Sequence, residues 1–211
     1  MNFGIRRALR GAAFVILGAG ALSACAPLVV GTVMIGSAMI VTDRRTSATQ
    51  LEDEVIEVKA KNRLQEALPE KGEISATSYN RMLLLTGVVP DMADKTKAEQ
   101  GVANIENVQS VVNELSVGGF PRSFSQRSSD VYLASKIRAS LIDAKDLFAN
   151  SIALVAWNGN VYLLGRVTER EAERATEVTR GVSGVQKVVK VFQIISEAEL
   201  SKTAPQTPAK P

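Results

Sequence analysis

The chain has 211 residues, 45% of them hydrophobic, and a formal net charge of +3. It contains no histidine and one cysteine, which excludes Ser-His-Asp and Cys-His catalysis, His-ligated zinc and an intramolecular disulfide. The basic residues Arg6, Arg7 and Arg10 precede that cysteine, and no acidic residue does. The rest of the chain therefore has as many basic as acidic side chains, 22 of each. A nucleic-acid-binding domain would carry a basic surplus, so we expect no nucleic acid as a partner.

The N-terminal segment has the pattern of a secretory signal, with basic residues, an apolar stretch over 11–21 and small residues before Cys25. The run Leu22-Ser23-Ala24-Cys25 resembles the lipobox of bacterial lipoproteins. This resemblance implies that residues 1–24 are removed and that Cys25 carries lipid on its thiol and on its new amino group. In that family, Ala26 rather than Asp after the cysteine favours transfer to the outer membrane. Two or more acyl chains anchor a protein stably.

A retained transmembrane anchor is the alternative for this segment. The region 11–41 is apolar almost throughout and exceeds the roughly 20 residues that span a bilayer. The tether that follows the lipidated cysteine is predicted over 25–50. Its apolar part, 26–41, either lies along the membrane or packs on the protein, and the sequence leaves both open.

The remaining chain repeats itself with a period of about 77 residues, as in Asp53 and Asp130, or Gly87 and Gly165. A period this long indicates two small domains rather than a solenoid, whose repeats are shorter. We place the domains at 51–117 and 130–196. A linker over 118–129 and a disordered tail over 197–211, rich in Pro, Thr, Ala and Lys towards its end, complete the chain.

Each domain begins with a helix that has apolar residues at spacings of four, in the second copy Leu133, Ile137 and Leu141. Ser129 or Asp130 is the expected N-cap of that helix. The elements that follow are two strands, a charged helix and a last strand, predicted in the second copy at 152–157, 161–167, 169–180 and 185–195. In the first copy the charged helix and last strand are predicted at 91–104 and 108–117.

This order predicts an α+β fold for each domain, αββαβ, with a three-stranded mixed sheet and two helices on one face. Asn158-Gly159 favours a type I′ turn between the second domain's first two strands. The first domain has Asn80-Arg81 in the same place, for which we expect a looser turn.

Three further groups are interpreted from their neighbours in the sequence. Phe120 and Phe124, in the linker, are expected to dock between the domains. Trp157 is either a packed strand residue or an interfacial anchor, and the sequence leaves this open. The acidic side chains of the charged helix alternate with arginines, which predicts a solvated face with ion pairs rather than a metal or catalytic site; they are Glu169, Glu171, Glu173 and Glu177.

The element order, the strand glycine and the run Gly181-Val182-Ser183-Gly184-Val185 resemble the BON domain. Two such copies behind a lipobox resemble the dual-BON outer-membrane lipoproteins of Gram-negative bacteria. Asn104 and Asn107 replace the two glycines in the first copy, so the match is weaker there. The resemblance implies no catalytic activity and no cofactor or metal. It implies binding of anionic phospholipid and support of outer-membrane integrity, with placement at the division site.

The two domains differ in charge. Residues 51–117 have a marked excess of acidic side chains, whereas residues 130–197 are nearly balanced. An anionic membrane should therefore repel the first domain and accept the second. The family places its phospholipid contact on the first helix of the second domain. We expect the contact around an amphipathic aromatic near basic side chains, and its predicted residues are Tyr132, Leu133, Lys136, Ile137, Arg138 and Ala139.

The resulting interpretation is an outer-membrane, lipid-anchored protein that faces the periplasm and binds anionic phospholipid through its second domain. The alternative is a protein-interaction adaptor whose acidic first domain docks on outer-membrane assembly machinery or on peptidoglycan-associated proteins. An enzyme is the third and weakest reading. The lipid species and the oligomeric state are not determined by the sequence.

Overall fold

The computed structural model describes residues 43–69 and 72–203. These described residues belong to one compact unit. The predicted signal sequence 1–24, Cys25, the apolar segment 26–41 and the tail from residue 204 onwards lie outside the described residues. In the part that the structure does describe, no helix is both long and apolar enough to cross a membrane.

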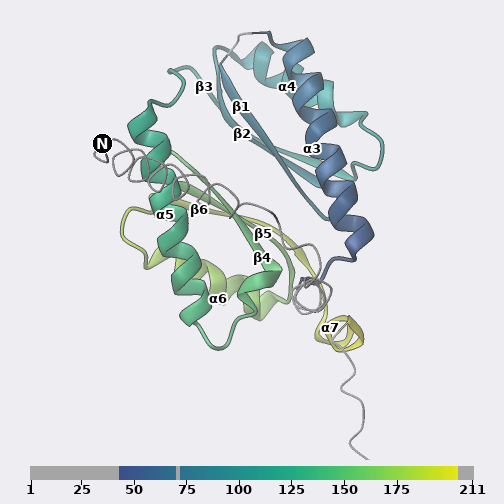
Figure 1. Cartoon of the computed structure of the whole chain (residues 1–211), viewed down its shortest axis with the longest axis vertical. Coiled ribbons are helices and arrows are strands. Elements are labelled where there is room, and N and C mark those ends of the chain that lie inside the picture. Colours follow the sequence, from purple (N-terminus) through teal and green to yellow (C-terminus); the bar gives the residue numbers. More distant parts are fainter. Residues whose placement is uncertain (1–42, 70–71, 204–211) are drawn as a thin grey trace, which may run out of the picture. The chain divides into compact units, whose positions relative to one another are not determined.

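Domain 1 has the predicted αββαβ order (Figure 1). Strand β1 pairs antiparallel with β2, and β2 pairs parallel with β3, so the sheet is mixed. Both helices lie on one face of the sheet and enclose a core that includes Ile56, Leu83 and Leu115. The elements are α3 (Ser47–Ala67), β1 (Glu73–Tyr79), β2 (Met82–Val89), α4 (Met92–Ala103) and β3 (Ser110–Val117).

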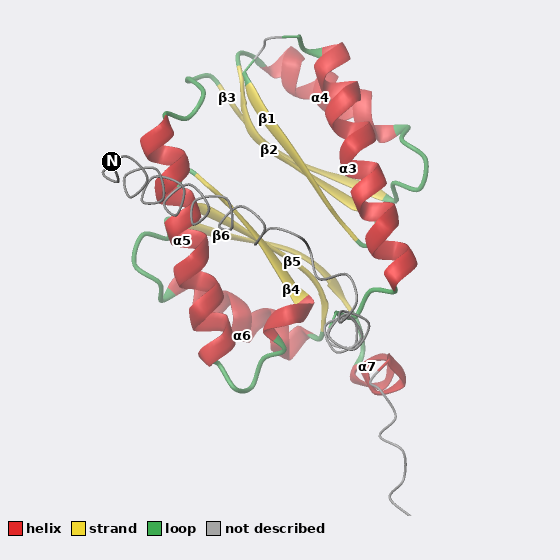
Figure 2. Ribbon diagram, viewed as in Figure 1, coloured by secondary structure: helices red, strands yellow, loops and turns green. Residues whose placement is uncertain are grey.

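Domain 2 repeats this arrangement with the same strand pairing (Figure 2). Its core includes the predicted stripe Leu133, Ile137 and Leu141. A single turn of 3-10 helix, Ala149–Ser151, precedes its first strand. The elements are α5 (Phe124–Asp143), β4 (Ile152–Trp157), β5 (Asn160–Val167), α6 (Glu169–Arg180) and β6 (Lys187–Ile194), and α7 (Glu197–Thr203) follows the domain. The predicted fold class is therefore confirmed for both domains.

Three helices extend into segments that the sequence predicted as tether, linker and tail, and two of them do so because a polar side chain caps the helix earlier than the apolar stripe suggests. Thr46 accepts the Thr49 N–H, so α3 begins within the predicted tether. Ser123 and Gln126 form a capping box, so α5 begins within the predicted linker. The beginning of the predicted disordered tail is α7, whose Glu199 N–H donates to Ser196 Oγ.

The first hairpin turn is as tight as the second, contrary to our expectation. Both central residues have positive φ in each turn: 50° and 66° at Asn80 and Arg81, 48° and 78° at Asn158 and Gly159. Arginine is rare in this conformation. It is held there because Asp53 accepts hydrogen bonds from the backbone N–H groups of both Asn80 and Arg81, each at 2.8 Å.

In each domain, one face of the sheet points away from the helices. These two faces share a third core cluster. It joins residues of both domains and is rich in aromatics: Tyr79, Leu84, Trp157, Tyr162, Leu164 and Val191. Tyr79 Oη donates to the Ser151 carbonyl across this contact at 3.1 Å. Trp157 is therefore a packed strand residue, 6% exposed. Because the cluster excludes water from apolar surface of both sheets, it ties the two domains together.

Candidate lipid-contact site

Helix α5 carries the predicted site, and its two faces have different roles. Leu133 and Ile137 are 6% and 0% exposed and belong to the core of domain 2. The inclusion of Ile137 among lipid-contacting residues is therefore wrong, because its side chain does not reach the surface, whereas Leu133 also lines a hollow beside Tyr132 and Lys136. The spacing of four that predicted the helix is the spacing of its buried stripe.

The surface of α5 outside this stripe exposes several large apolar side chains. Tyr132 is 67% exposed and Val131 68%, while Phe124 in the first turn is 86% exposed. Phe120, just before the helix, is 91% exposed. The expectation that Phe120 and Phe124 dock between the domains is wrong. The gap that they were expected to fill is occupied by the aromatic cluster of the two sheets.

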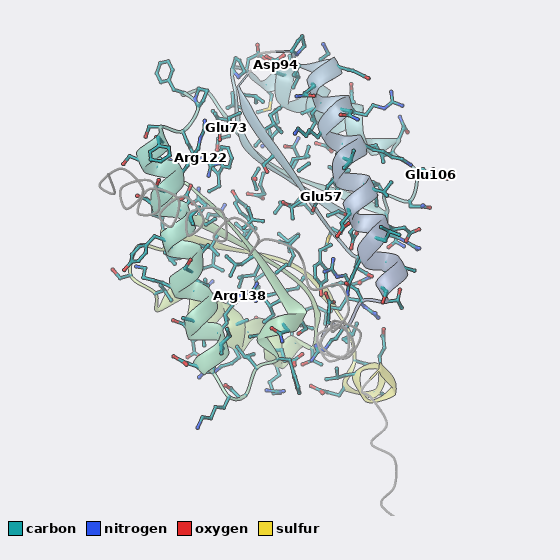
Figure 3. All side chains as sticks on the ribbon, in the orientation of Figure 1. Glu57, Glu73, Asp94, Glu106, Arg122 and Arg138 are labelled. Atoms are coloured by element: carbon teal, nitrogen blue, oxygen red, sulfur yellow. The ribbon has the colours of Figure 1, made fainter. Side chains whose placement is uncertain are left out.

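The two predicted cations of α5 are held in different ways. Lys136 Nζ lies 5.2 Å from the centroid of the Tyr132 ring and donates to the Ser183 carbonyl. The arginine at 138 lies deeper, since its Nη1 donates to the carbonyls of Ala149 and Ile152, both at 2.9 Å. Lys136 thus presents charge beside an exposed aromatic, whereas the guanidinium of residue 138 serves mainly to fasten α5 to the sheet (Figure 3).

A polar hollow of about 310 Å³ lies beside Tyr132 and Lys136, between α5, the β4–β5 turn and the loop before β6. Its wall is rich in hydroxyl and amide groups, among them Ser125, Gln126 and Ser129. Ala139, the last predicted site residue, is exposed on the same helix. A cation, hydroxyl groups and an exposed ring together match the needs of a phosphate-containing headgroup at a membrane interface.

Each domain contains an arginine that binds a buried aspartate and stacks near an aromatic ring. We call this arrangement the clasp, and sequence reasoning missed it. In domain 2, Arg122 Nη1 donates to Asp130 Oδ2 at 2.7 Å, and its guanidinium lies 3.4 Å from the centroid of the Trp157 ring. Asp130 also accepts the N–H groups of Asn158 and Gly159. This buried aspartate is therefore not a helix cap but the residue that holds the hairpin turn.

Domain 1 has the same clasp at positions 77 or 78 residues earlier. Arg45 donates to Asp53 at 2.9 Å and lies 4.1 Å from the centroid of the Tyr79 ring. The signal was present in the sequence, because Arg45-Thr46 and Arg122-Ser123 match at the period of the repeat. The match falls before the predicted domain boundaries and was therefore overlooked.

Two largely buried ion pairs connect segments that are distant in the sequence. Arg122 Nη2 donates to Glu73 of domain 1 at 3.0 Å, and both side chains are marked in Figure 3. Burial tends to raise the pKa of Glu73, but hydrogen bonds from the Arg122 side chain and backbone outweigh it and lower the pKa. Arg122 therefore belongs to the clasp of domain 2 and also connects the two domains.

The second long-range pair joins the segment before α3 to domain 2. Arg44 makes a bidentate contact with Glu171, both hydrogen bonds being 2.7 Å long. Burial tends to raise the pKa of Glu171, but the hydrogen bonds from Arg44 and Thr168 lower it overall. Glu171 is 1% exposed, so it does not belong to the solvated face predicted for α6. Glu173 and Glu177 do, with ion pairs to Lys190 and Arg174.

Comparison with known proteins supports the duplication. The BON domain family matches residues 52–119 and 129–196. The outer membrane lipoprotein DolP of Haemophilus influenzae is 35% identical over 177 residues, which cover 82% of this chain and 90% of that protein. A 21 kDa hemolysin of Actinobacillus pleuropneumoniae is 32% identical over 155 residues, 72% of this chain and 79% of that protein.

A more distant likeness was found among solved structures. CdsD, a structural protein of the Type III secretion system of Chlamydia trachomatis, aligns with 72% of this chain and 98% of that one, at 13% identity and a TM-score of 0.29. That score is too low to support an argument about fold or function.

Proposed function

The chain belongs to the family of dual BON-domain outer-membrane lipoproteins, and from this premise we propose that its second domain binds anionic phospholipid and so supports outer-membrane integrity. The observation that carries the proposal is the exposed face of α5, where Tyr132 and Lys136 lie together above a polar hollow. In this proposal the lipidated Cys25 keeps the protein at the outer membrane, facing the periplasm, with placement at the division site. No catalytic step is proposed.

Domain 1 is the natural control for this proposal, because the repeat places a matched residue at every position. Val55 stands on α3 where Tyr132 stands on α5, and it is 44% exposed. Around it lie acidic side chains, including the exposed Glu54. An anionic bilayer should attract the face of α5 and repel that of α3.

The test is binding of vesicles to a form of the chain that begins at Thr42 and so omits the apolar segment 26–41. This form keeps Arg44 and Arg45, which a shorter fragment would lose. Tyr132→Glu should weaken binding to vesicles that contain an anionic phospholipid by about tenfold or more, since it removes an interfacial ring and adds a repelled charge. Val55→Glu should change the affinity less than about twofold.

Three outcomes would contradict the proposal. Equal losses from the two variants would mean that the domains contact lipid alike. Unchanged binding in both, or equal binding to purely zwitterionic vesicles, would remove α5 as the lipid-contact site. Thermal unfolding of each variant shows whether the fold is retained, as expected for two exposed positions.

Anchoring is tested separately at Cys25. Cys25→Ala removes the single acylation site that the sequence offers, so the variant should leave the outer-membrane fraction when cells are separated by density. If the variant co-fractionates fully with that membrane, the lipoprotein anchor is rejected.

A second candidate function is docking of another envelope protein on domain 1, such as a component of outer-membrane assembly or a peptidoglycan-associated protein. The observation that favours it is an exposed apolar stripe on α3, Leu51, Val55 and Val58, on a domain whose charge disfavours an anionic membrane. A photo-crosslinking residue placed in cells at Val58 should capture one defined protein, and the same residue at Val131 of α5 should not.

A further inference from the structure

The free edge of strand β1 offers unpaired backbone groups to another strand. The sheet of domain 1 has the order β1-β2-β3, so one side of β1 has no neighbouring strand. The Ser78 N–H points to that side, because it donates to Glu57 Oε1 at 2.8 Å. Amides alternate between the two sides of a strand, so those of Ile74 and Ala76 point the same way. Among the described residues, neither of these amides has a hydrogen-bond partner.

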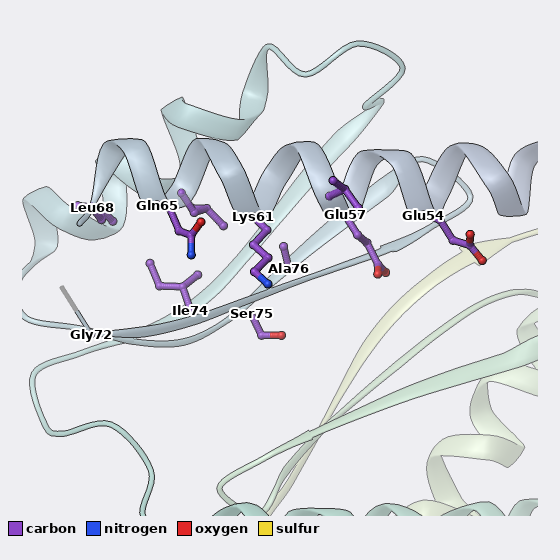
Figure 4. Close-up of a pocket in the computed structure, with 11 residues that line it drawn as sticks. Glu54, Glu57, Lys61, Gln65, Leu68, Gly72, Ile74, Ser75 and Ala76 are labelled. Atoms are coloured by element: carbon purple, nitrogen blue, oxygen red, sulfur yellow. The ribbon is translucent and has the colours of Figure 1, made fainter. Parts of the chain in front are cut away.

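A groove runs along this edge, beneath α3 (Figure 4). It has a volume of about 690 Å³ and is lined by both α3 and β1. Its wall is partly apolar, with Val58, Leu64 and Ile74. The acidic Glu54 and Glu57 lie at one end of the row of lining residues on α3, and Leu68 lies at the other.

The same place in domain 2 is closed by a side chain. Arg138, which corresponds to Lys61 in the repeat, donates to the outward carbonyl of Ile152 and to that of Ala149. Lys61 lines the groove of domain 1 and makes no ion pair or hydrogen bond within the described residues. Proteins commonly protect exposed sheet edges, because such edges pair with other chains. Here one copy of the fold is protected and the other is open.

We propose that the groove between α3 and β1 binds an extended, basic peptide segment of another protein, which adds to β1 as a fourth strand. This inference rests on the docking role proposed above for domain 1 and names its site and the chemistry of its partner. The outward amides of Ile74 and Ala76 and their carbonyls would pair with the peptide backbone. Alternate peptide side chains would face the apolar wall, and an arginine or lysine would meet Glu54 and Glu57.

Charge and composition favour this occupant over two others. A second copy of the chain would bring the same acidic groove against its own, and the like charges would repel. The chain's own tail, residues 204–211, has prolines at 205, 208 and 211, and proline cannot donate to a strand ladder. Burial, with smaller contributions from Asp53 and Glu54, raises the pKa of Glu57 overall, although the hydrogen bond from the Ser78 N–H lowers it. A peptide cation would relieve this unfavourable environment.

The test uses the full lipidated chain in detergent micelles and two synthetic, end-blocked peptides that alternate valine and threonine. One peptide carries two arginines at one end, and its twin carries two glutamates there. The arginine peptide should bind saturably and slow the hydrogen exchange of the Ile74 and Ala76 amides. The glutamate twin should bind about tenfold more weakly or worse, because it meets like charges.

Ala76→Pro removes one outward N–H and leaves the β1–β2 pairing untouched, a change that edge strands tolerate. It should weaken binding of the arginine peptide by about tenfold, while the matched Ala76→Ser, which keeps the N–H, should stay within about twofold. If Ala76→Pro does not fold, Glu54→Lys at the exposed end of the groove should still weaken binding by about fivefold.

Several results would overturn the inference. One is the absence of saturable binding of the arginine peptide. Another is undiminished binding of that peptide to both the Ala76→Pro and the Glu54→Lys variants. Protection of Ile74 and Ala76 that disappears when residues 204–211 are deleted would assign the groove to the tail. Protection that grows with protein concentration would assign it to a second copy. If the Val58 crosslink in cells persists in Ala76→Pro, docking on domain 1 stands and the groove is rejected as its site.

Discussion

Domains 1 and 2 share a fold and a clasp but differ at the surface of their first helix. In both, an arginine before that helix binds a buried aspartate that holds the hairpin turn. On α5 the matched surface position is Tyr132, beside Lys136, whereas on α3 it is Val55, among acidic residues. The groove beside the first strand is closed by Arg138 in domain 2 and open in domain 1. The two copies have therefore kept the contacts that shape the hairpin, whereas their helix faces and sheet edges have diverged.

The largest expected effect tests whether the two clasps are equivalent. Arg122→Ala should lower the free energy of unfolding by about 3 kcal/mol or more, because it removes the cation paired with the buried Asp130 and leaves Glu73 with only the more distant Arg127. Arg45→Ala should cost about half as much, since Asp53 retains Ser78 Oγ as a donor in addition to the two backbone N–H groups that both aspartates keep. Urea unfolding followed by Trp157 fluorescence measures both. Equal costs would show that the contact of Arg122 with domain 1 adds nothing.

The next effect sharpens the contrast in membrane affinity. Lys136 and Lys59 occupy matched positions of α5 and α3, and Lys59 pairs with Glu106 at 3.2 Å. Lys136→Gln should weaken binding to anionic vesicles by about fivefold, the equivalent of about 1 kcal/mol for one cation near the surface. Lys59→Gln should leave the affinity unchanged. The loss should shrink at high ionic strength because the interaction is screened, and a loss that does not depend on salt would contradict a headgroup role for Lys136.

Acid should loosen the contacts between the domains. The pKa values of Glu73 and Glu171 are lowered in the folded protein by their hydrogen bonds to Arg122 and Arg44, which outweigh burial. A lowered carboxyl pKa stabilises the fold above the ordinary glutamate value, and this contribution is lost as the pH falls through the folded pKa. The urea midpoint should therefore fall as the pH drops below about 4.5. The urea midpoint of Glu171→Gln should fall less in acid than that of the wild type. An identical fall would show that the Glu171 carboxyl does not contribute to the acid sensitivity.

The smallest expected effect concerns an asymmetry of the first helices. Glu57 of α3 has a raised pKa, chiefly because of burial, whereas its counterpart on α5 is Ala134. A raised carboxyl pKa means that the ionised form disfavours folding above that pKa. Glu57→Gln keeps an acceptor for the Ser78 N–H and should slightly raise the urea midpoint near about pH 7. The gain should vanish in acid, where glutamate is protonated, and a lower midpoint near neutral pH would contradict the assignment.

The two domains, their element order and their sheet topology could be predicted from the sequence. The repeat and the spacing of apolar residues report local geometry, which depends on neighbours along the chain. The exposure of Tyr132 followed from the same reasoning, because residues beside a buried helical stripe face outwards. The helix boundaries were less predictable, since Ser123 and Thr46 act as caps through hydrogen bonds that apolar spacing does not report.

Only the tertiary structure decided where the polar and aromatic side chains meet. The role of Asp130 as the residue that holds the turn, the burial of Glu171 against Arg44, and the packing of Tyr79 with Trp157 all join residues far apart in the sequence. The same holds for Phe120 and Phe124, which are exposed because other aromatics fill the space between the sheets. Periodicity shows which side of an element is apolar, but long-range packing determines which partner covers it and which edge stays open.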